Sequence, residues 1–504
     1  MPRRSASLIP ILAPRAPGIP AYRWLYDSLR AEILAGRLRP GRRLPGTRDL
    51  ARQYGLSRGT VVSAFEQLAA EGYVEGVVGS GTHVASDLPD DLFEIAGAAR
   101  APSIARRRAA RRLSAYARRA EPFPALEPRP PRAFRANRPA LDLFPTTLWS
   151  QLAARRLRRI SAGRLLGGDP LGMPALRDAI AEYLTASRGV RCDPAQVVVV
   201  AGVQEALDLV ARVTLDPGDR VCLEDPGYPA AANVFASVGA RLVDVSVDAE
   251  GMEVSPSRLR GSRLVYVTPA HQFPLGITMS LRRRLALLEW VRGSTALIFE
   301  DDYDSEYRYA GRPVPALQGL DASGSVLFAG SFGKVLFPAL RLGYLVLPPD
   351  LVDVVAAAKS LTSRHPPVLE QEVLLDFIVG GHFGRHLRRM RELYAERLAA
   401  LLEAAREKLA GALELSPVEA GLQTAGRLRD GLAAETVARA AAARGVEATP
   451  LGWFSRGRPP FEGLQLGFAA VDVAEIRRGV RELASAIEEV ARAPRRASRS
   501  RPAS

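Results

Sequence analysis

Apolar side chains near the start of the chain recur every three or four residues, which is the spacing of one helix face. This spacing runs through three successive stretches, 22–38, 48–54 and 58–71. The apolar positions on their inner faces are Leu25, Leu29, Ile33, Val61, Phe65 and Leu68. Thr47 and Ser57 stand just before the second and third stretches and suit the N-cap position. The pattern therefore predicts three consecutive helices.

Two short strands, Tyr73-Val74 and Thr82 to Val84, follow these helices and flank a glycine-rich turn. Three helices and such a hairpin are typical of a winged helix-turn-helix, whose recognition helix enters the DNA major groove with its first residues. The starts of the last two helices and the turn would meet base edges and phosphates. The predicted DNA-binding residues are Arg48, Ser57, Arg58, Thr60, Gly79, Ser80 and Gly81. A three-helix protein-interaction module is the alternative.

From Phe134 onward, short apolar runs alternate with amphipathic stretches of helical spacing. The runs that fit buried strands are 197–200, 264–267, 296–299 and 326–329. Buried strands that alternate with helices predict an α/β region with a mostly parallel sheet. In such sheets the ligand site lies at the carboxyl ends of the strands. Polar residues directly after these runs are therefore candidates for a site.

Lys334 comes shortly after the last of these runs. The chain has only three lysines among its 69 basic residues, so 66 (69 − 3) are arginines. A lysine amine can form a Schiff base with an aldehyde, which a guanidinium cannot do. Ser331 and Arg341 on either side of it suit a phosphate group. A ligand with both an aldehyde and a phosphate points to pyridoxal phosphate (PLP). A surface lysine at a strand end is the alternative.

Further polar residues follow the other runs. A carboxylate within 300–302 could keep a pyridine nitrogen protonated, and Tyr303 could hydrogen-bond the ring oxygen. Tyr228 could stack on a flat ring. Residues 202–207 open a helix whose free amides could bind phosphate. Each acid alone also suits a helix cap, but several such loops beside one lysine favour a cofactor site.

The net charge of +15 is concentrated in a few segments. Residues 99–135 contribute +9, from eleven arginines against Glu121 and Glu127. Clustering of this kind favours contact with a polyanion at one end of the protein. A general bias of the composition toward arginine explains it equally well.

The remaining composition narrows the class of protein. The two cysteines, Cys192 and Cys222, lie far apart, which fits a reducing cytosol and predicts no metal cluster. No apolar run reaches the roughly 18 residues of a membrane span. The start of the chain does not resemble a signal peptide, because Pro10 interrupts its short apolar piece. These features predict a cytoplasmic protein without a metal site.

The expected organisation has five parts. They are an N-terminal tail (1–19), the winged helix-turn-helix (20–86), a basic linker rich in Arg and Pro (87–133), a PLP-binding domain (134–492) and a disordered basic tail (493–504). The linker has spacing for a transient helix around 104–119 and is stiffened by prolines at its end.

Two stretches of sequence resemble known families. The segments 44–51, 55–61, 71–73 and 79–82 are similar to the DNA-binding domain of GntR-superfamily regulators. The order of segments after Phe134 resembles fold-type I PLP-dependent aminotransferases. The runs 300–307 and 331–344 look specifically like MocR-type regulators, which fuse a GntR winged helix to an aminotransferase-like domain.

The resemblance implies a role for each residue of the cofactor site. Lys334 would hold the PLP aldehyde as the catalytic lysine. Asp301 would face the pyridine nitrogen, Tyr303 the ring hydroxyl and Tyr228 the ring face. The phosphate would be held by Ser331, Arg341, Val203 and Gln204. The resemblance also implies a homodimer arranged head-to-tail, with each winged helix near the partner's large domain.

Three positions depart from the aminotransferase pattern. Phe273 stands where an asparagine usually contacts the ring oxygen, and Gly167 where a tyrosine precedes Gly-Asp-Pro. Gln465 stands where aminotransferases place the arginine that grips the substrate α-carboxylate. Glutamine is neutral and cannot replace a bidentate ion pair. An ordinary amino acid would therefore bind poorly unless another arginine substitutes.

These observations predict a PLP-dependent transcriptional regulator that binds operator DNA. Its effector is either PLP itself, with control of vitamin B6 synthesis, or an amine or amino acid that forms an aldimine in place of Lys334, with control of amino acid metabolism. The regulator is expected to have no physiological turnover, although its aminotransferase-like domain could retain weak transaminase activity. The alternative is a working aminotransferase with an added DNA-binding domain.

Overall fold

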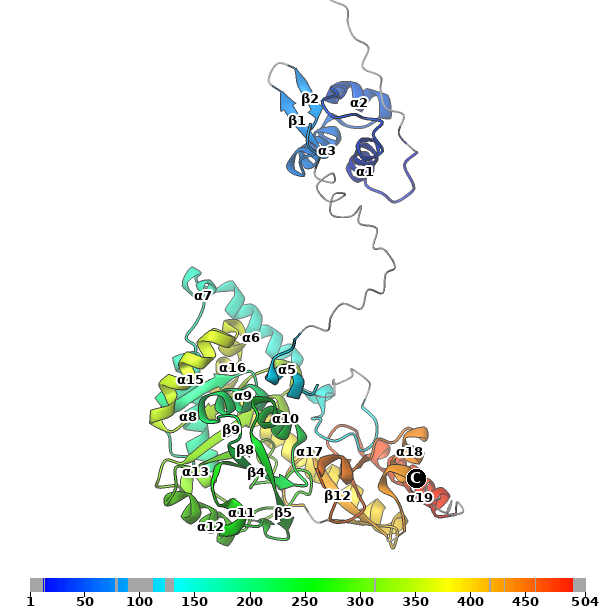
Figure 1. Ribbon diagram of the computed structural model, residues 1–504. Helices are drawn as coiled ribbons and strands as arrows, with labels where there is room; N and C mark the ends of the chain where they lie inside the picture. The colour runs from blue at the N-terminus through cyan, green and yellow to red at the C-terminus, as the bar shows by residue number, and fades with distance from the viewer. Residues whose placement is uncertain are drawn as a thin grey trace, which may run out of the picture. The chain divides into compact units, whose positions relative to one another are not determined.

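The computed structural model describes residues 12, 14–77, 80–88, 112–122, 131–311, 314–416, 418–429, 431–457 and 459–492. Contacts divide the chain into two compact units, 1–112 and 113–504, which are described separately (Figure 1). The predicted DNA-binding residue Gly79, most of the predicted linker and the tail 493–504 lie outside the described residues. None of the helices in the described ranges is long and apolar enough to cross a membrane.

The first unit is a winged helix-turn-helix. It contains α1 (Ala21–Leu34), α2 (Thr47–Tyr54), α3 (Arg58–Ala70) and the antiparallel strands β1 (Val74–Val77) and β2 (Gly81–Val84). The predicted inner faces meet in one core that includes Leu25, Leu29, Ile33, Val61, Phe65 and Leu68. Ser57 caps α3 as predicted, because its Oγ accepts a hydrogen bond from the Thr60 amide at 3.1 Å.

The expected cap of α2 was wrong. The N-cap is Gly46, and Thr47 is already the first helical residue. Gly46 has extended backbone angles and offers no side-chain acceptor. Asp49 lies in the first turn of α2, where its negative charge is favourable next to the helix N-terminus.

The second unit is built on an eight-stranded sheet in the order β3-β10-β9-β8-β7-β4-β5-β6. Its strands are β3 (Val197–Val200), β4 (Arg220–Asp225), β5 (Arg241–Asp248), β6 (Gly251–Met252), β7 (Ser262–Val267), β8 (Leu297–Asp302), β9 (Val326–Ser331) and β10 (Gly343–Val346). Neighbouring strands from β9 to β5 run parallel, whereas β10 is antiparallel to both of its neighbours and β6 is antiparallel to β5. The expected mostly parallel sheet is confirmed.

Helices cover both faces of this sheet. The side chains of Val198 and Val200 pack with α9 (Val203–Thr214), α10 (Pro229–Val238) and α15 (Pro349–Thr362). The alternate side chains, Val197 and Val199, pack into the opposite core. The helices of that core include α8 (Pro174–Arg188), α16 (Val368–Val379) and α17 (His382–Lys408), and α12 (Leu281–Arg292) covers the same sheet farther along. A strand buried on both sides explains the unbroken run of four valines.

A smaller antiparallel sheet forms the end of the second unit. Its order is β11 (Leu413–Leu415), β12 (Gln423–Leu428), β14 (Gly463–Gly467) and β13 (Thr449–Pro450). The helices α18 (Ala434–Ala443) and α19 (Val473–Arg492) pack on one of its faces. Further short or peripheral helices are α6 (Thr146–Arg158), α7 (Ala162–Leu166), α11 (Pro256–Leu259), α13 (Leu317–Leu320) and α14 (Phe332–Val335).

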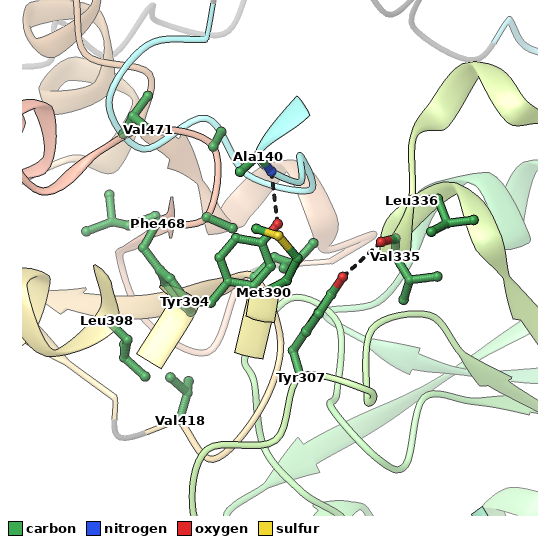
Figure 2. Close-up of a cluster of buried hydrophobic side chains, with 14 of the residues drawn as sticks. Ala140, Tyr307, Val335, Leu336, Met390, Tyr394, Leu398, Val418, Phe468 and Val471 are labelled. Carbon is green, nitrogen blue, oxygen red and sulfur yellow. Dashed lines mark hydrogen bonds between the residues drawn. The ribbon is translucent and has the colours of Figure 1, made fainter. Parts of the chain in front are cut away.

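The long helix α17 connects the two sheets. Figure 2 shows Met390 and Tyr394 of this helix in an apolar cluster with Phe468. The Tyr394 hydroxyl accepts a hydrogen bond from the Ala140 amide at 2.9 Å, and Tyr307 donates one to the Val335 carbonyl at 2.9 Å. These bonds hold the N-terminal segment of the unit and the lysine-bearing helix α14 against one core.

Part of the predicted linker is docked on the second unit. The short helix α5 (Ala115–Arg119) lies within the expected transient helix. Arg119 donates a hydrogen bond from Nε to the Ser237 carbonyl at the end of α10, at 3.1 Å. The guanidinium of Arg212 in α9 lies 5.7 Å from the ring centre of Tyr116. This stretch therefore contacts α9 and α10 instead of forming free linker.

Candidate cofactor site and nucleic-acid interface

The residues predicted to bind the phosphate lie where the ends of three strands are side by side. Ser331 at the end of β9 pairs with Gly343 of β10, and Gly343 pairs with Val200 of β3. Arg341 lies two residues before Gly343, in a left-handed backbone conformation with φ 52°. A Cβ atom placed on Gly202 would lie only 3.7 Å from Nη1 of Arg341. The topology thus places Ser331 and Arg341 beside the turn that opens α9.

This turn exposes the amides of the first residues of α9. Gly202 is the N-cap, with φ 101°, and no side chain caps the helix. The amides of Val203 and Gln204 therefore lie among the unpaired donors of the first turn. Gly343 lets the strands approach closely, because a Cβ there would lie 3.1 Å from the Gly202 Cα. A guanidinium, a hydroxyl and free helix amides are the donors that a phosphate dianion requires.

The three consecutive carboxylates 300–302 lie within β8, so the expectation that they follow the strand was wrong. Strand pleating sends their side chains to alternate sides. Glu300 accepts hydrogen bonds from the amides of Leu317 and Gln318, and Asp302 pairs with Arg188 at 2.7 Å. Only Asp301 of this run is directed to the Lys334 side of the sheet.

Asp301 has one free oxygen. Its Oδ2 accepts a hydrogen bond from the Tyr266 hydroxyl at 2.7 Å, whereas the buried Oδ1 has no partner among the described residues. Burial raises the pKa of Asp301 to about 7, against the opposing effects of the Tyr266 hydroxyl and the Lys334 amine. A protonated ring nitrogen would supply both the missing donor and a compensating positive charge. The residues present therefore fit PLP.

Lys334 lies in the one-turn helix α14 after β9. Its Nζ donates a hydrogen bond to the Asn137 carbonyl at 3.2 Å. Burial lowers the pKa of Lys334 to about 8; the carboxylates of Asp304 and Asp301 oppose this shift, and the guanidinium of Arg138 adds to it. A lowered pKa increases the neutral fraction of the amine, which is the form that attacks an aldehyde.

Two tyrosines complete the predicted ring site. Burial raises the pKa of Tyr228; the charge of Asp301 acts in the same direction, and that of Arg341 opposes it. Tyr303 pairs through its hydroxyl with Nδ1 of His271 at 3.0 Å. The ring of Phe273 makes an edge-to-face contact with each phenol, with ring centres 5.6 Å from Tyr228 and 6.0 Å from Tyr303.

Sequence reasoning missed a buried network behind Tyr303. Asp304 binds His271 Nδ1 through Oδ1 at 2.8 Å and accepts the Leu422 amide through Oδ2 at 3.1 Å. Gln423, the next residue, accepts the Asn137 amide through its Oε1 at 3.0 Å. The network joins the large sheet, the small sheet and the segment that contacts Lys334. The acids at 300–307 were noticed in the sequence, but Leu422, whose amide Asp304 accepts, lies 118 residues away in the chain.

The predicted DNA contacts surround the start of α3 and the wing. Arg48 and Arg58 are exposed at the first turns of α2 and α3. The hydroxyls of Ser57 and Thr60 lie 2.8 Å apart, and Ser80 Oγ lies 2.9 Å from His83 Nε2. Gly81 has φ 102°.

Arg43 was not predicted to take part. Its guanidinium lies beside the wing, because a Cβ on Gly81 would come within 3.2 Å of its Nε. Arg43 also forms an isolated β-bridge with His83 of β2. It is a further cation at the surface where this fold meets DNA.

Two family models match the chain. Residues 21–84 match the bacterial regulatory proteins of the gntR family, and residues 137–483 match aminotransferase class I and II. The chain is 44% identical to the probable rhizopine catabolism regulatory protein MocR of Rhizobium meliloti, over 93% of this chain and 94% of that protein. It is 30% identical to the pyridoxine biosynthesis regulator PdxR of Corynebacterium glutamicum, over 92% and 95% of the two chains.

Solved structures resemble the second unit. LysN, an α-aminoadipate aminotransferase from Thermus thermophilus complexed with N-(5'-phosphopyridoxyl)-L-leucine, matches with a TM-score of 0.66 and 30% identity, covering 71% of this chain and 92% of that one. An archaeal alanine:glyoxylate aminotransferase matches with a TM-score of 0.70 and 27% identity, covering 75% and 98%. With a gntR-type winged helix at its start, an aminotransferase fold that fits PLP, and full-length similarity to MocR, the chain belongs to the MocR-type, PLP-dependent transcriptional regulators.

Proposed function

We propose that this regulator senses the occupancy of the Lys334 site, by PLP or by a primary amine, and that occupancy changes operator binding by a homodimer. The single observation that supports this most strongly is that Oδ1 of Asp301, on the Lys334 side of the sheet, has no hydrogen-bond partner within the described part of the chain. When bound, PLP supplies an aldehyde that condenses reversibly with primary amines. The protein holds its phosphate with Ser331, Arg341, Val203 and Gln204 and its ring with Asp301, Tyr303 and Tyr228.

Helices provide a route from this site to the linker. The phosphate turn opens α9, and Tyr228 is the N-cap of α10. Helix α5 of the linker contacts both helices, through Tyr116 with Arg212 and through Arg119 with Ser237. A ligand can shift the balance between two conformations of a protein only by the difference between its affinities for them. Small movements of α9 and α10 on binding would thus reach the residues that lead to the winged helix.

A dimer is supported by exposed apolar side chains on the second unit. They are Leu157, Leu165, Leu166, Leu361 and Val379, which are between 53% and 90% exposed. An ion pair between Arg156 and Asp376 links α6 to α16, and a Cβ on Gly167 would lie 3.2 Å from His365 Nε2, which links the end of α7 to the segment after α15. Exposed apolar side chains of this kind are typical of protein–protein interaction sites and support the proposed contact between subunits. Two winged helices would then read two half-sites.

The alternative, a working aminotransferase, is weakened by Gln465. It is buried on β14 and offers only a neutral amide to a substrate carboxylate. The similar proteins named for rhizopine catabolism and for pyridoxine biosynthesis carry names from different pathways. These names therefore do not identify one effector for this chain.

The test is operator binding by the full-length protein with and without PLP, at one fixed salt concentration because phosphate contacts make affinity salt-dependent. We expect PLP to change the affinity several-fold and Lys334→Ala to abolish the change. Lys408→Ala, at the exposed end of α17, is the matched control. Equal operator affinity with and without bound PLP would contradict the proposal. Release of a keto acid from an amino acid at steady turnover would instead favour the alternative, a working aminotransferase.

A further inference from the structure

We infer that Lys359 and Glu205 form a positioning pair for the turn that opens α9, and that this pair lets the turn accept a phosphate group. Glu205 holds the backbone of the turn, and Lys359 cancels the negative charge that Glu205 would otherwise present to the phosphate. The inference rests on the proposed function and names the residues through which the same site selects a phosphorylated aldehyde.

Lys359 is a buried cation in a chain that uses arginine almost everywhere. It is one of three lysines beside 66 arginines (69 − 3). Its position in α15 is only 1% exposed. An ammonium group is seldom buried unless an anion pairs with it. Its Nζ donates hydrogen bonds to Oε1 of Glu205 at 2.7 Å and to Oγ of Ser363 at 3.3 Å. The charge of Lys359 is thus committed to one carboxylate.

Glu205 holds the turn from inside the first turn of α9. Its Oε2 accepts a hydrogen bond at 2.5 Å from the amide of Ala201, the residue before the N-cap Gly202. Its Oε1 accepts the Ser363 hydroxyl at 2.9 Å as well as Lys359. Burial alone would raise the pKa of Glu205, but the hydrogen bonds from Lys359 and Ala201 outweigh burial and lower it. Glu205 is therefore an ionised group that fixes the backbone directly before Gly202.

This carboxylate stands close to the predicted phosphate site. It is bonded to the residue next to Gly202, and a Cβ atom on Gly202 would lie 3.7 Å from Nη1 of Arg341. An anion at the start of a helix occupies the positive end of the helix dipole, and a second anion nearby is repelled by it. Glu205 would therefore oppose a phosphate if its charge were not balanced. Lys359 balances it and leaves the bond to Ala201 intact.

The sign of the effect separates this role from a purely structural one. If the pair only stabilised the fold, loss of either partner would loosen the turn and weaken the binding of PLP. If charge balance matters, loss of Lys359 leaves an anion beside the phosphate, whereas loss of the Glu205 charge leaves a cation there. The two single substitutions should then change the preference for a phosphate in opposite directions.

The experiment measures the affinity of the full-length protein for PLP and for pyridoxal, which carries the same aldehyde without the phosphate. The absorbance change on attachment to Lys334 gives each dissociation constant, and the ratio of the two isolates the contribution of the phosphate. We expect Lys359→Met to weaken the binding of PLP about ten-fold or more and that of pyridoxal less than about two-fold. Glu205→Gln should raise the preference for PLP over pyridoxal about three-fold or more.

Further variants assign the effect to the pair. The double variant Lys359→Met/Glu205→Gln removes both charges and should return the preference to within about three-fold of the original. If Lys359→Met does not fold, comparison of Glu205→Gln with the double variant measures the same effect of Lys359. Lys408→Met, at the exposed end of α17, and Asp208→Asn, in a surface ion pair on the next turn of α9, are the controls and should not change the preference.

Three outcomes would overturn the inference. They are a preference for PLP that falls in Glu205→Gln as it does in Lys359→Met, an equal loss of both aldehydes in Lys359→Met, and an unchanged preference in every variant. In each case the proposed function survives if PLP still changes operator binding by the unaltered protein. If the unaltered protein binds neither aldehyde, the proposed function falls together with the inference.

Discussion

Replacing Asp301 by asparagine tests whether the Asp301 carboxyl group in β8 lowers the stability of the PLP-free protein while it strengthens the binding of PLP. Burial raises the pKa of Asp301 to about 7, from an ordinary value near 3.9. The folded state binds this proton more tightly than the unfolded state. The loss of folding stability that the Asp301 carboxyl group causes is therefore absent below about pH 4 and grows until about pH 7. A shift of about three units corresponds to at most about 4 kcal/mol.

The asparagine introduced by Asp301→Asn would keep an acceptor for the Tyr266 hydroxyl, but its amide donor would lack a partner, which costs about 1–3 kcal/mol. We therefore expect the substitution to stabilise the PLP-free protein by about 1–3 kcal/mol at pH 8 and to remove most of its stability loss between pH 5 and pH 8. The same variant loses a charge-assisted hydrogen bond to the ring nitrogen, worth about 1.5–3 kcal/mol, and should bind PLP roughly 10- to 100-fold more weakly.

Urea unfolding of the PLP-free protein at both pH values, together with PLP titration by absorbance, measures both effects. The control is Asp302→Asn in the same strand. Asp302 is paired with the buried Arg188 at 2.7 Å, so breaking this pair should destabilise the protein by about 3–5 kcal/mol. The two substitutions, at adjacent residues, should therefore change the free energy of unfolding at pH 8 in opposite directions. The reasoning is refuted if Asp301→Asn lowers stability at pH 8 or leaves PLP affinity unchanged.

Three further predictions concern the lysine, the DNA interface and the linker helix. Because burial lowers the pKa of Lys334 to about 8, the rate of PLP attachment, measured by stopped-flow absorbance, should rise with pH and level off above about pH 8. A rate that still rises toward pH 10 would contradict a buried amine at this position. Arg58→Ala should weaken operator binding by about 1–3 kcal/mol, whereas Arg52→Ala, which is exposed and ion-paired with Asp49, should have little effect in a gel shift. Arg119→Ala removes the bond from α5 to the end of α10, so PLP should still bind with its usual absorbance while its effect on operator affinity shrinks; an unchanged effect would exclude this route.

The features predicted from the sequence were those that depend on local pattern. The helices of the winged helix-turn-helix follow from apolar spacing, and the valines of β3 follow from burial on both sides. The meeting of Ser331 and Arg341 with the turn of Val203 and Gln204 was inferred by resemblance, and the strand register gives a physical cause for it. The error about the carboxylates 300–302 has a simple origin, because the apolar run ends before the strand does.

The missed residues depend on contacts between distant parts of the chain. Asp304 binds the Leu422 amide, 118 residues away, and Gln423 binds Asn137, 286 residues away. No local spacing distinguishes these side chains from ordinary polar residues of a loop or strand. Likewise, the docking of α5 depends on a contact with the Ser237 carbonyl at the end of α10. The composition of the stretch does not reveal this contact, so the stretch looked like part of a free linker.

The docking of α5 on α10 shortens the stretch of sequence, here called the tether, that joins the winged helix to the second unit. The tether runs from Leu88, where the first unit's core ends, to Leu113 just before α5, which is 25 residues (113 − 88). A chain of that length reaches at most about 90 Å when fully extended. If α5 were released, the anchor would move to Ala133 and add 20 residues (133 − 113), or about 70 Å of further reach. Half-sites on DNA repeat about every 34–36 Å, so in the proposed dimer the docking or release of α5 would decide how many helical turns of operator two winged helices can bridge.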